Sequence, residues 1–117
     1  MTKKTYDLEE RTLVFAKRVR EFVKKLPKTI GNIEYGKQLI RASGSVGANY
    51  IEANEALSKK DFIHRIKILR KEAKESKYWL QLVDLFNKEI LEEERKNLLQ
   101  EAIELIKIFS SIIQKSG

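Results

Sequence analysis

The chain has 117 residues, of which 24 are Lys or Arg and 17 are Asp or Glu, so its formal net charge is +7. This length predicts a single domain, residues 1–117, with a core large enough to fold without disulfides or metal. Cysteine is absent, which excludes disulfide frameworks, iron–sulfur clusters and thiolate zinc sites. At 42% apolar residues, the chain is too apolar to be disordered.

No apolar run reaches the roughly 18 residues needed to span a bilayer, and residues 1–7 lack the apolar stretch of a signal peptide. The sequence therefore predicts a cytoplasmic protein with no membrane segment. The positive charge suits an anionic partner such as RNA or DNA, but charge alone identifies no partner.

The first predicted helix begins at Asp7 and ends at Pro27. We expect the Asp7 carboxylate to cap its first turn, with Glu10 completing a capping box. The second helix opens after Gly31-Asn32. One apolar stripe follows at helical spacing, over residues 39–53.

Gly44 and Gly47 lie inside the second helix, where each lowers helix propensity by about 1 kcal/mol relative to Ala. They indicate either close contact with a neighbouring helix or a kink. The third helix begins at Ser58 and is expected to run to about Asn87, and the fourth follows the turn at Asn87 and Lys88. No segment has a strand pattern.

Four amphipathic helices of about 18 to 27 residues, joined by short loops, predict an all-α, antiparallel up-down-up-down four-helix bundle. The fourth helix carries more apolar residues than one stripe requires. A face this wide indicates either oligomerisation or a central position in a monomeric core. The additional residues are Ile103, Ile106, Ile108, Ile112 and Ile113.

The positive charge is concentrated in two helices. Residues 1–30 and 58–87 have net charges of +5 and +4, whereas residues 31–57 and 88–117 have −1 each. In the third helix, basic residues follow one another at steps of three and four and end in an aromatic side chain. This row consists of Lys60, His64, Lys67, Lys71, Lys74 and Tyr78.

Such a row can follow phosphates while Tyr78 offers a surface for base stacking. The first helix adds further bases, chiefly Lys17, Arg18 and Lys24. The alternative is a solvated outer face whose lysines serve solubility.

A polar stripe lies beside the apolar stripe of the second helix, at steps of three and four. It consists of Gln38, Arg41, Ser45, Asn49 and Glu52. Three interpretations are open: a hydrogen-bonded network with Arg65, Glu72 and Glu75 of the third helix, a subunit contact, or a small-molecule pocket. We favour the internal network.

Three tests for a catalytic or cofactor-binding motif are negative. A di-iron bundle requires Glu-x-x-His pairs on two helices, and His64 is the only histidine. Glu72 and Glu75 share a helix face, but no histidine accompanies them for acid–base work. The glycines of residues 43–47 lack the Gly-Lys-Ser/Thr of a P-loop. We expect no catalytic residue, no metal, no cofactor and no enzymatic activity.

Residues 38–53, QLIRASGSVGANYIEA, resemble the Q-L-x-R-A-x-x-S-[IV]-x-x-N-x-x-E-[GA] signature of the 23S rRNA-intervening-sequence proteins, a four-helix-bundle family. Residues 71–80, KEAKESKYWL, resemble the second signature of that family. The resemblance extends from about Tyr6 to Ile113. The chain departs from the commoner pattern at Ile40, Gly47 and the Ala53-Asn54 pair.

This resemblance implies an up-down bundle that assembles into a homopentameric ring. It also implies kinship with the accessory variability protein of diversity-generating retroelements, a basic pentamer that associates with nucleic acid. The leading hypothesis is a non-enzymatic oligomer that binds RNA or other nucleic acid through the basic faces of its first and third helices. The alternative is a protein-interaction scaffold whose charge serves solubility or an acidic protein partner.

Overall fold

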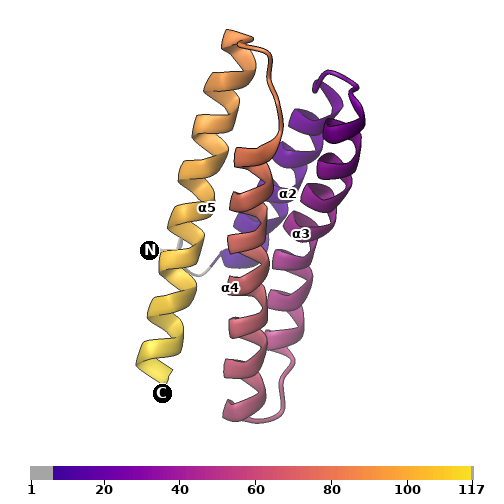
Figure 1. Cartoon of the computed structure of the whole chain (residues 1–117). Coiled ribbons are helices and arrows are strands. Elements are labelled where there is room, and N and C mark those ends of the chain that lie inside the picture. Colours follow the sequence, from indigo (N-terminus) through magenta and orange to yellow (C-terminus); the bar gives the residue numbers. More distant parts are fainter. Residues whose placement is uncertain (1–6, 117) are drawn as a thin grey trace.

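The computed structural model describes residues 7–116 and contains four helices in antiparallel order. Helix α2 spans Leu8–Lys24, α3 Ile30–Asn54, α4 Lys59–Leu82 and α5 Glu89–Ser116. They form an elongated bundle of 46 × 29 × 19 Å (Figure 1). Helix α4 packs against α3 and α5, whereas α2 and α4 lie across the bundle from each other. The expected all-α four-helix architecture is confirmed.

Serine and threonine caps fix the starts of the two central helices. The Thr29 hydroxyl accepts a hydrogen bond from the backbone N–H of Asn32, and the Ser58 hydroxyl accepts one from Asp61, each at 3.1 Å. Helix α3 therefore begins at Ile30, ahead of the Gly31-Asn32 start expected from the sequence.

The expected side-chain cap at Asp7 is wrong. Asp7 occupies the N-cap position, but its carboxylate accepts no hydrogen bond from the first turn. Its backbone angles, φ −101° and ψ 48°, differ from the extended conformation that directs a capping side chain back onto the helix.

The buried core follows the predicted apolar stripes and runs the length of the bundle. Removing these side chains from water is the main favourable term in folding. Its largest fully buried members come from all four helices and the α4–α5 connection: Phe15, Phe22, Leu39, Ile66, Leu69, Leu80, Leu85, Leu105 and Phe109.

Helix α4 ends at Leu82, five residues before the predicted end at Asn87. Val83 adopts an extended conformation, which stops the helix. Asn32 then holds the connection in place. Its side-chain amide donates to the carbonyls of Pro27 and Asp84 at 2.9 and 2.8 Å, and its Oδ1 accepts from the Asp84 N–H at 2.8 Å. One buried side chain therefore ties both connections at this end of the bundle together.

The glycines of α3 differ in their surroundings, and the helix continues through both. A Cβ at Gly47 would lie 2.9 Å from Oγ1 of Thr12, a buried residue of α2, so Gly47 permits the close contact between α2 and α3. A Cβ at Gly44 would meet nothing within 4 Å. The packing of the bundle therefore explains Gly47 and leaves Gly44 unexplained.

The additional isoleucines of α5 are half-buried, and Ile106, Ile108, Ile112 and Ile113 pack against the core of the same chain. The bundle itself therefore covers part of the wide apolar face of α5. Exposed apolar side chains occur on α2 and α3, including Leu13, Ile33, Ile40 and Ile51, and also at Leu57, Phe86 and Ile90 near the ends of helices.

Arg11 joins α2 to α5, the least extensively packed pair of neighbouring helices. Its guanidinium donates to both carboxylate oxygens of Glu101, at 2.7 and 3.0 Å, and to Glu104 at 2.9 Å. The hydrogen bond to Glu101 is the main reason that the pKa of Arg11 is raised above its usual value.

Replacing the buried Asn32 with alanine removes all three hydrogen bonds that its side chain forms with the two connections. We expect Asn32→Ala to lower the free energy of unfolding by about 2 kcal/mol and the melting temperature by about 5 to 10 °C. Asn97→Ala is the matched control, because Asn97 is exposed on α5. Thermal unfolding followed by circular dichroism tests the difference, and equal stability of the two variants would contradict it.

Candidate nucleic-acid interface

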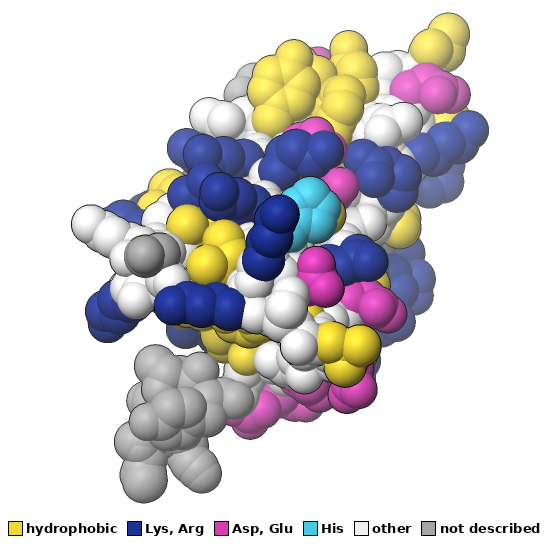
Figure 2. Space-filling view, turned by 90° about the horizontal axis from the view of Figure 1, so that it is seen from below, with side chains coloured by type: hydrophobic (Ala, Val, Ile, Leu, Met, Phe, Trp, Pro, Cys, Tyr) yellow, Lys and Arg dark blue, Asp and Glu magenta, His cyan; other side chains and the backbone are white. Residues whose placement is uncertain are grey.

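The basic row of α4 consists of Lys60, His64, Lys67, Lys71 and Lys74 and ends at Tyr78. All six side chains are exposed. None of its four lysines forms an ion pair with the residues that the structure describes. Figure 2 views the molecule from the end where α4 begins and shows Lys and Arg side chains around the histidine. The positive charge of this row is not neutralised within the bundle.

An aromatic cluster lies at the far end of the row. The Tyr78 and Trp79 rings meet edge to face with centroids 5.1 Å apart, and Trp79 stacks on Tyr35 of α3 at 5.8 Å. Trp79 and Tyr35 are half-buried, whereas 57% of Tyr78 is exposed. Tyr78 is therefore an exposed ring held in place by its neighbour, and it can stack against an unpaired base.

The bases predicted on α2 have different surroundings. Lys24 pairs with Glu21 at 3.2 Å, and Arg20 pairs with the same carboxylate at 2.9 Å. The hydrogen bond from Arg20, followed by the one from Lys24, lowers the pKa of Glu21. Lys17 and Arg18 have no such ion pair among the described residues. Part of the α2 charge is therefore neutralised by its own helix.

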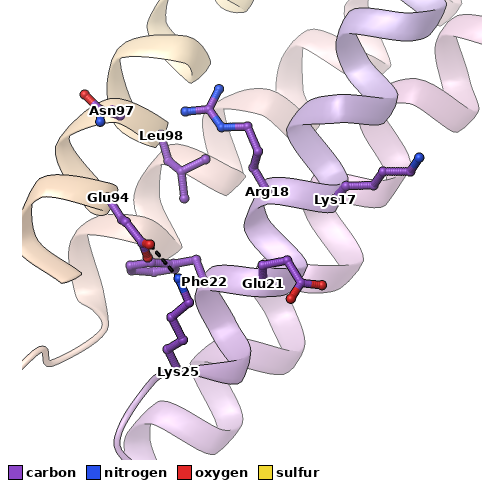
Figure 3. Close-up of a pocket in the computed structure, with 8 residues that line it drawn as sticks. All are labelled: Lys17, Arg18, Glu21, Phe22, Lys25, Glu94, Asn97 and Leu98. Carbon is purple, nitrogen blue, oxygen red and sulfur yellow. Dashed lines mark hydrogen bonds and ion pairs between the residues drawn. The ribbon is translucent and has the colours of Figure 1, made fainter. Parts of the chain in front are cut away.

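A groove of about 390 Å³ lies between α2 and α5, where these helices pack least extensively (Figure 3). Phe22 and Leu98 lie at its floor, and Lys25 of α2 pairs with Glu94 of α5 at 2.6 Å. Arg18 extends from α2 toward α5, whereas Lys17 points away. The lining also includes Glu21, so its charges nearly cancel.

Because α2 and α4 lie diagonally, their basic residues do not merge into one surface. The α4 row is continuous and unpaired, whereas the α2 bases border a groove of mixed charge. The α4 row contains no Asp or Glu, so an extended anion can contact it along its whole length.

The polar stripe of α3 meets α4. The Arg41 guanidinium lies 3.2 Å from a Glu75 carboxylate oxygen and 3.6 Å from one of Glu72. Arg65 donates to Oδ1 of Asn49 at 3.1 Å, and the Asn49 amide donates to the Ser45 carbonyl at 2.9 Å. These contacts join α3 to α4 within one chain, and Ser45 takes part only through its backbone carbonyl.

Two members of the polar stripe stand apart from these contacts. Gln38 is exposed and forms no side-chain hydrogen bond with the described residues. Glu52 is exposed and borders a hollow at the α3–α4 turn, together with Asp61 and His64. No group of three His, Cys, Asp or Glu side chains in residues 7–116 is arranged to hold a metal ion.

Glu72 is the buried carboxylate of this network, with 9% of the residue exposed. Its Oε1 atom has no hydrogen-bond partner among the described residues and lies beside Arg41. An ionised carboxylate in such surroundings depends on the nearby cation, because burial away from water disfavours its charge.

The apolar surface of α3 was missed from the sequence, although a signal was present. Ile33, Ile40 and Ile51 repeat at steps of 7 and 11, a helical spacing on the side opposite the buried stripe.

Among the described helices, none is long and apolar enough to cross a membrane.

The fold and these contacts define the class: a basic four-helix bundle with a charged network between its second and third helices. Over residues 4–111 the chain matches the family model of the 23S rRNA-intervening sequence protein. The chain belongs to this family.

A solved structure supports the same assignment. It is the 1.70 Å crystal structure of a protein with unknown function from the S23 ribosomal protein family of Bacteroides thetaiotaomicron VPI-5482. The two chains are 33% identical with a TM-score of 0.75, and the match covers 90% of this chain and 96% of the other. No curated protein matches the sequence.

The pairing of Arg41 with Glu72 is tested by a double-mutant cycle. We expect Arg41→Gln and Glu72→Gln each to lower the free energy of unfolding by about 1 kcal/mol. Arg41→Gln leaves the Glu72 carboxylate without its nearby cation, and Glu72→Gln leaves Arg41 with Glu75 alone. The double variant should lose about 0.5 to 1 kcal/mol less than the sum of the two. Urea unfolding measures all three.

The control cycle uses Glu21 and Lys24, an exposed pair one helical turn apart. Its coupling should be no more than about 0.5 kcal/mol. Equal coupling in the two cycles would contradict a special role for the buried carboxylate.

Proposed function

We propose that this chain is a non-enzymatic nucleic-acid-binding protein whose α4 basic row contacts the phosphates of RNA or DNA. The main support for this proposal is that the four lysines of the row are exposed and lack ion pairs within the described structure. From Lys60 to Lys74 the row extends about 21 Å along the helix axis, long enough to face several successive phosphates. Family membership is consistent with an RNA partner.

Tyr78 favours a partner with unpaired bases. Lysine contacts alone bind any phosphate backbone, whereas an exposed aromatic ring adds about 1 to 3 kcal/mol for each base that stacks on it. Lys17 and Arg18 of α2 form a second, weaker contact region on the opposite side of the bundle. Lys24, which already pairs with Glu21, contributes less than the sequence indicated.

We also propose that the chain acts as a homo-oligomer, for which the family resemblance implies a ring of five. Each copy would add another α4 row, so several weak phosphate contacts on one strand would act together. A scaffold that binds a different protein is the second candidate function, and the exposed apolar side chains of α2 and α3 favour it.

The nucleic-acid proposal is tested by reversing three charges of the row. Relative to the unchanged protein, Lys67→Glu/Lys71→Glu/Lys74→Glu should weaken binding of single-stranded RNA at least about 100-fold at low salt. It should also flatten the dependence of affinity on salt concentration, because fewer counterions are released. Fluorescence anisotropy with a labelled oligonucleotide at several salt concentrations measures both.

Lys96→Glu/Lys107→Glu/Lys115→Glu is the matched control, because it changes the net charge equally on exposed positions of α5. Equal losses in the two variants would show that overall charge, rather than the α4 row, determines binding. No binding by the unchanged protein at low salt would contradict the proposed function.

The assembly proposal is tested by mass in solution. Light scattering coupled to size-exclusion chromatography should give a mass several times the 13.7 kDa of one chain. A mass of five chains would support the ring. A monomeric mass over the micromolar range would remove both the assembly and its multivalent binding.

A further inference from the structure

Two aromatic side chains of the described residues are largely exposed, and both lie toward the same end of the bundle. Tyr78 is 57% exposed and Phe86 is 53% exposed, whereas the other Phe, Tyr and Trp side chains of residues 7–116 are buried or half-buried. Leu82, one helical turn beyond Tyr78, is also exposed. Figure 1 shows that the connection carrying Phe86 continues from the end of α4 to the start of α5. Tyr78, Leu82 and Phe86 are named the apolar end.

The backbone holds Phe86 in an unusual conformation. Its φ is 52° and that of Asn87 is 59°, in the left-handed region that bulky side chains rarely adopt. Glycine or asparagine would adopt this conformation at lower cost. A strained residue that is also exposed points to a binding role, because residues of this kind cluster at ligand sites.

The contacts around Phe86 fix the ring rather than leave it on a free loop. The Phe86 N–H donates to Oδ1 of Asp84 at 2.9 Å, and Leu85 between them is buried in the core. Asp84 is itself fixed by Asn32, whose side chain bonds to the Asp84 carbonyl and N–H at 2.8 Å each. A ring ordered in advance loses little conformational entropy when a ligand stacks on it.

Charge and aromatic rings are separated along this side of the molecule. Residues 60–74 contain six bases and two acids, a net charge of +4, whereas residues 78–88 contain one of each. The α4 basic row has no Phe, Tyr or Trp before Tyr78. Single-strand sites stack successive bases on aromatic rings, whereas lysines alone contact phosphates, which a paired strand offers equally. The basic row therefore suits a duplex, and the apolar end suits unpaired bases.

We propose that this chain recognises the junction between a paired stem and an unpaired tail of RNA or DNA. The phosphates of the stem lie along the lysines of the α4 basic row, and bases of the tail stack on Tyr78 and Phe86. The inference rests on the proposed nucleic-acid binding and names the form of nucleic acid that the same surface selects.

The length of the chain between the two rings sets the length of the tail. Four helical residues and four extended ones place the Phe86 backbone at most about 20 Å beyond that of Tyr78. This span corresponds to roughly six nucleotides at the rise of about 3.4 Å per nucleotide of a stacked strand. A tail of about eight nucleotides therefore reaches both rings.

The first test compares RNA hairpins by fluorescence anisotropy. The probes are a stem of about 12 base pairs without a tail, the same stem with a tail of about eight nucleotides at its 5′ or its 3′ end, and the tail alone. One of the two tailed hairpins should bind at least about tenfold more tightly than the stem and than the tail.

The outcomes separate this inference from the proposed function. Equal affinity for the stem and both tailed hairpins would overturn the junction and retain nucleic-acid binding. A tail that binds alone as tightly as the tailed hairpins would overturn it too. No binding to any of the probes would overturn the proposed function itself.

The second test removes the Phe86 ring without disturbing the backbone. Phe86→Asn should weaken binding of the preferred tailed hairpin at least about fivefold and leave the affinity for the tailless stem unchanged. Its melting temperature should stay within about 3 °C, because asparagine tolerates a positive φ. Phe86→Tyr should retain the affinity of the unchanged protein, since it keeps an aromatic ring.

Leu57→Asn is the matched control, because Leu57 is an exposed apolar residue of the connection at the opposite end of the bundle. It should bind both hairpins as the unchanged protein does. A folded Phe86→Asn variant that still prefers the tailed hairpin, or that loses both hairpins equally, would overturn the role of Phe86.

Discussion

Glu72 is a buried carboxylate at the contact between α3 and α4, and Arg41 is the cation that lies beside it. A charge at such a position disfavours any packing that moves its partner away. A shift of α4 by one turn, about 5.4 Å, would separate Glu72 from Arg41 and Arg65 from Asn49. These contacts therefore favour a single register for the most extensive helix pair. Burial of Ile66 and Leu69 on the opposite face of α4 leaves the lysines of the basic row exposed.

Much of this arrangement follows from periodicity. Leu39 is buried and lies on the predicted apolar stripe of the second helix. Phe15, Ile66 and Leu105 are buried in the other three helices, each of which was predicted to be amphipathic. The polar stripe of α3 was also predicted to meet α4, since Arg41 and Asn49 border the apolar stripe. The buried stripes and the position of the polar stripe depend on side-chain spacing within one helix, and this spacing can be read directly from the sequence.

The features that sequence reasoning missed depend on tertiary contacts. Helix α4 ends at Leu82 because Asn32, fifty-two positions before Asp84, takes the hydrogen bonds of the connection. The spacing of apolar residues within 58–87 gives no information about a hydrogen-bond partner at Asn32. The Asp7 cap failed for a related reason: residue type permits a cap, but the backbone conformation decides whether the carboxylate reaches the helix.

Charge per segment was likewise an incomplete guide. Residues 1–30 and 58–87 have nearly equal excess charge, yet their surfaces differ. Arg11, Lys24 and Lys25 of the first segment lie within ion-pair distance of Glu101, Glu21 and Glu94. Two of these three acids belong to α5, whose net charge is negative. The fold therefore places the acidic helix beside α2, whereas the lysines of the α4 row have no ion pair among the described residues.

For apolar residues too, the number in a segment differs from the number that the fold leaves exposed. Exposed isoleucine and mid-helix glycine both cost a monomeric helix stability or solubility, and α3 carries both on one side. Four of the five additional α5 isoleucines pack against the chain's own core and are half-buried. Among the described residues, the α2 and α3 side of the bundle therefore carries both exposed isoleucines and the one helix glycine that packing within the chain leaves unexplained.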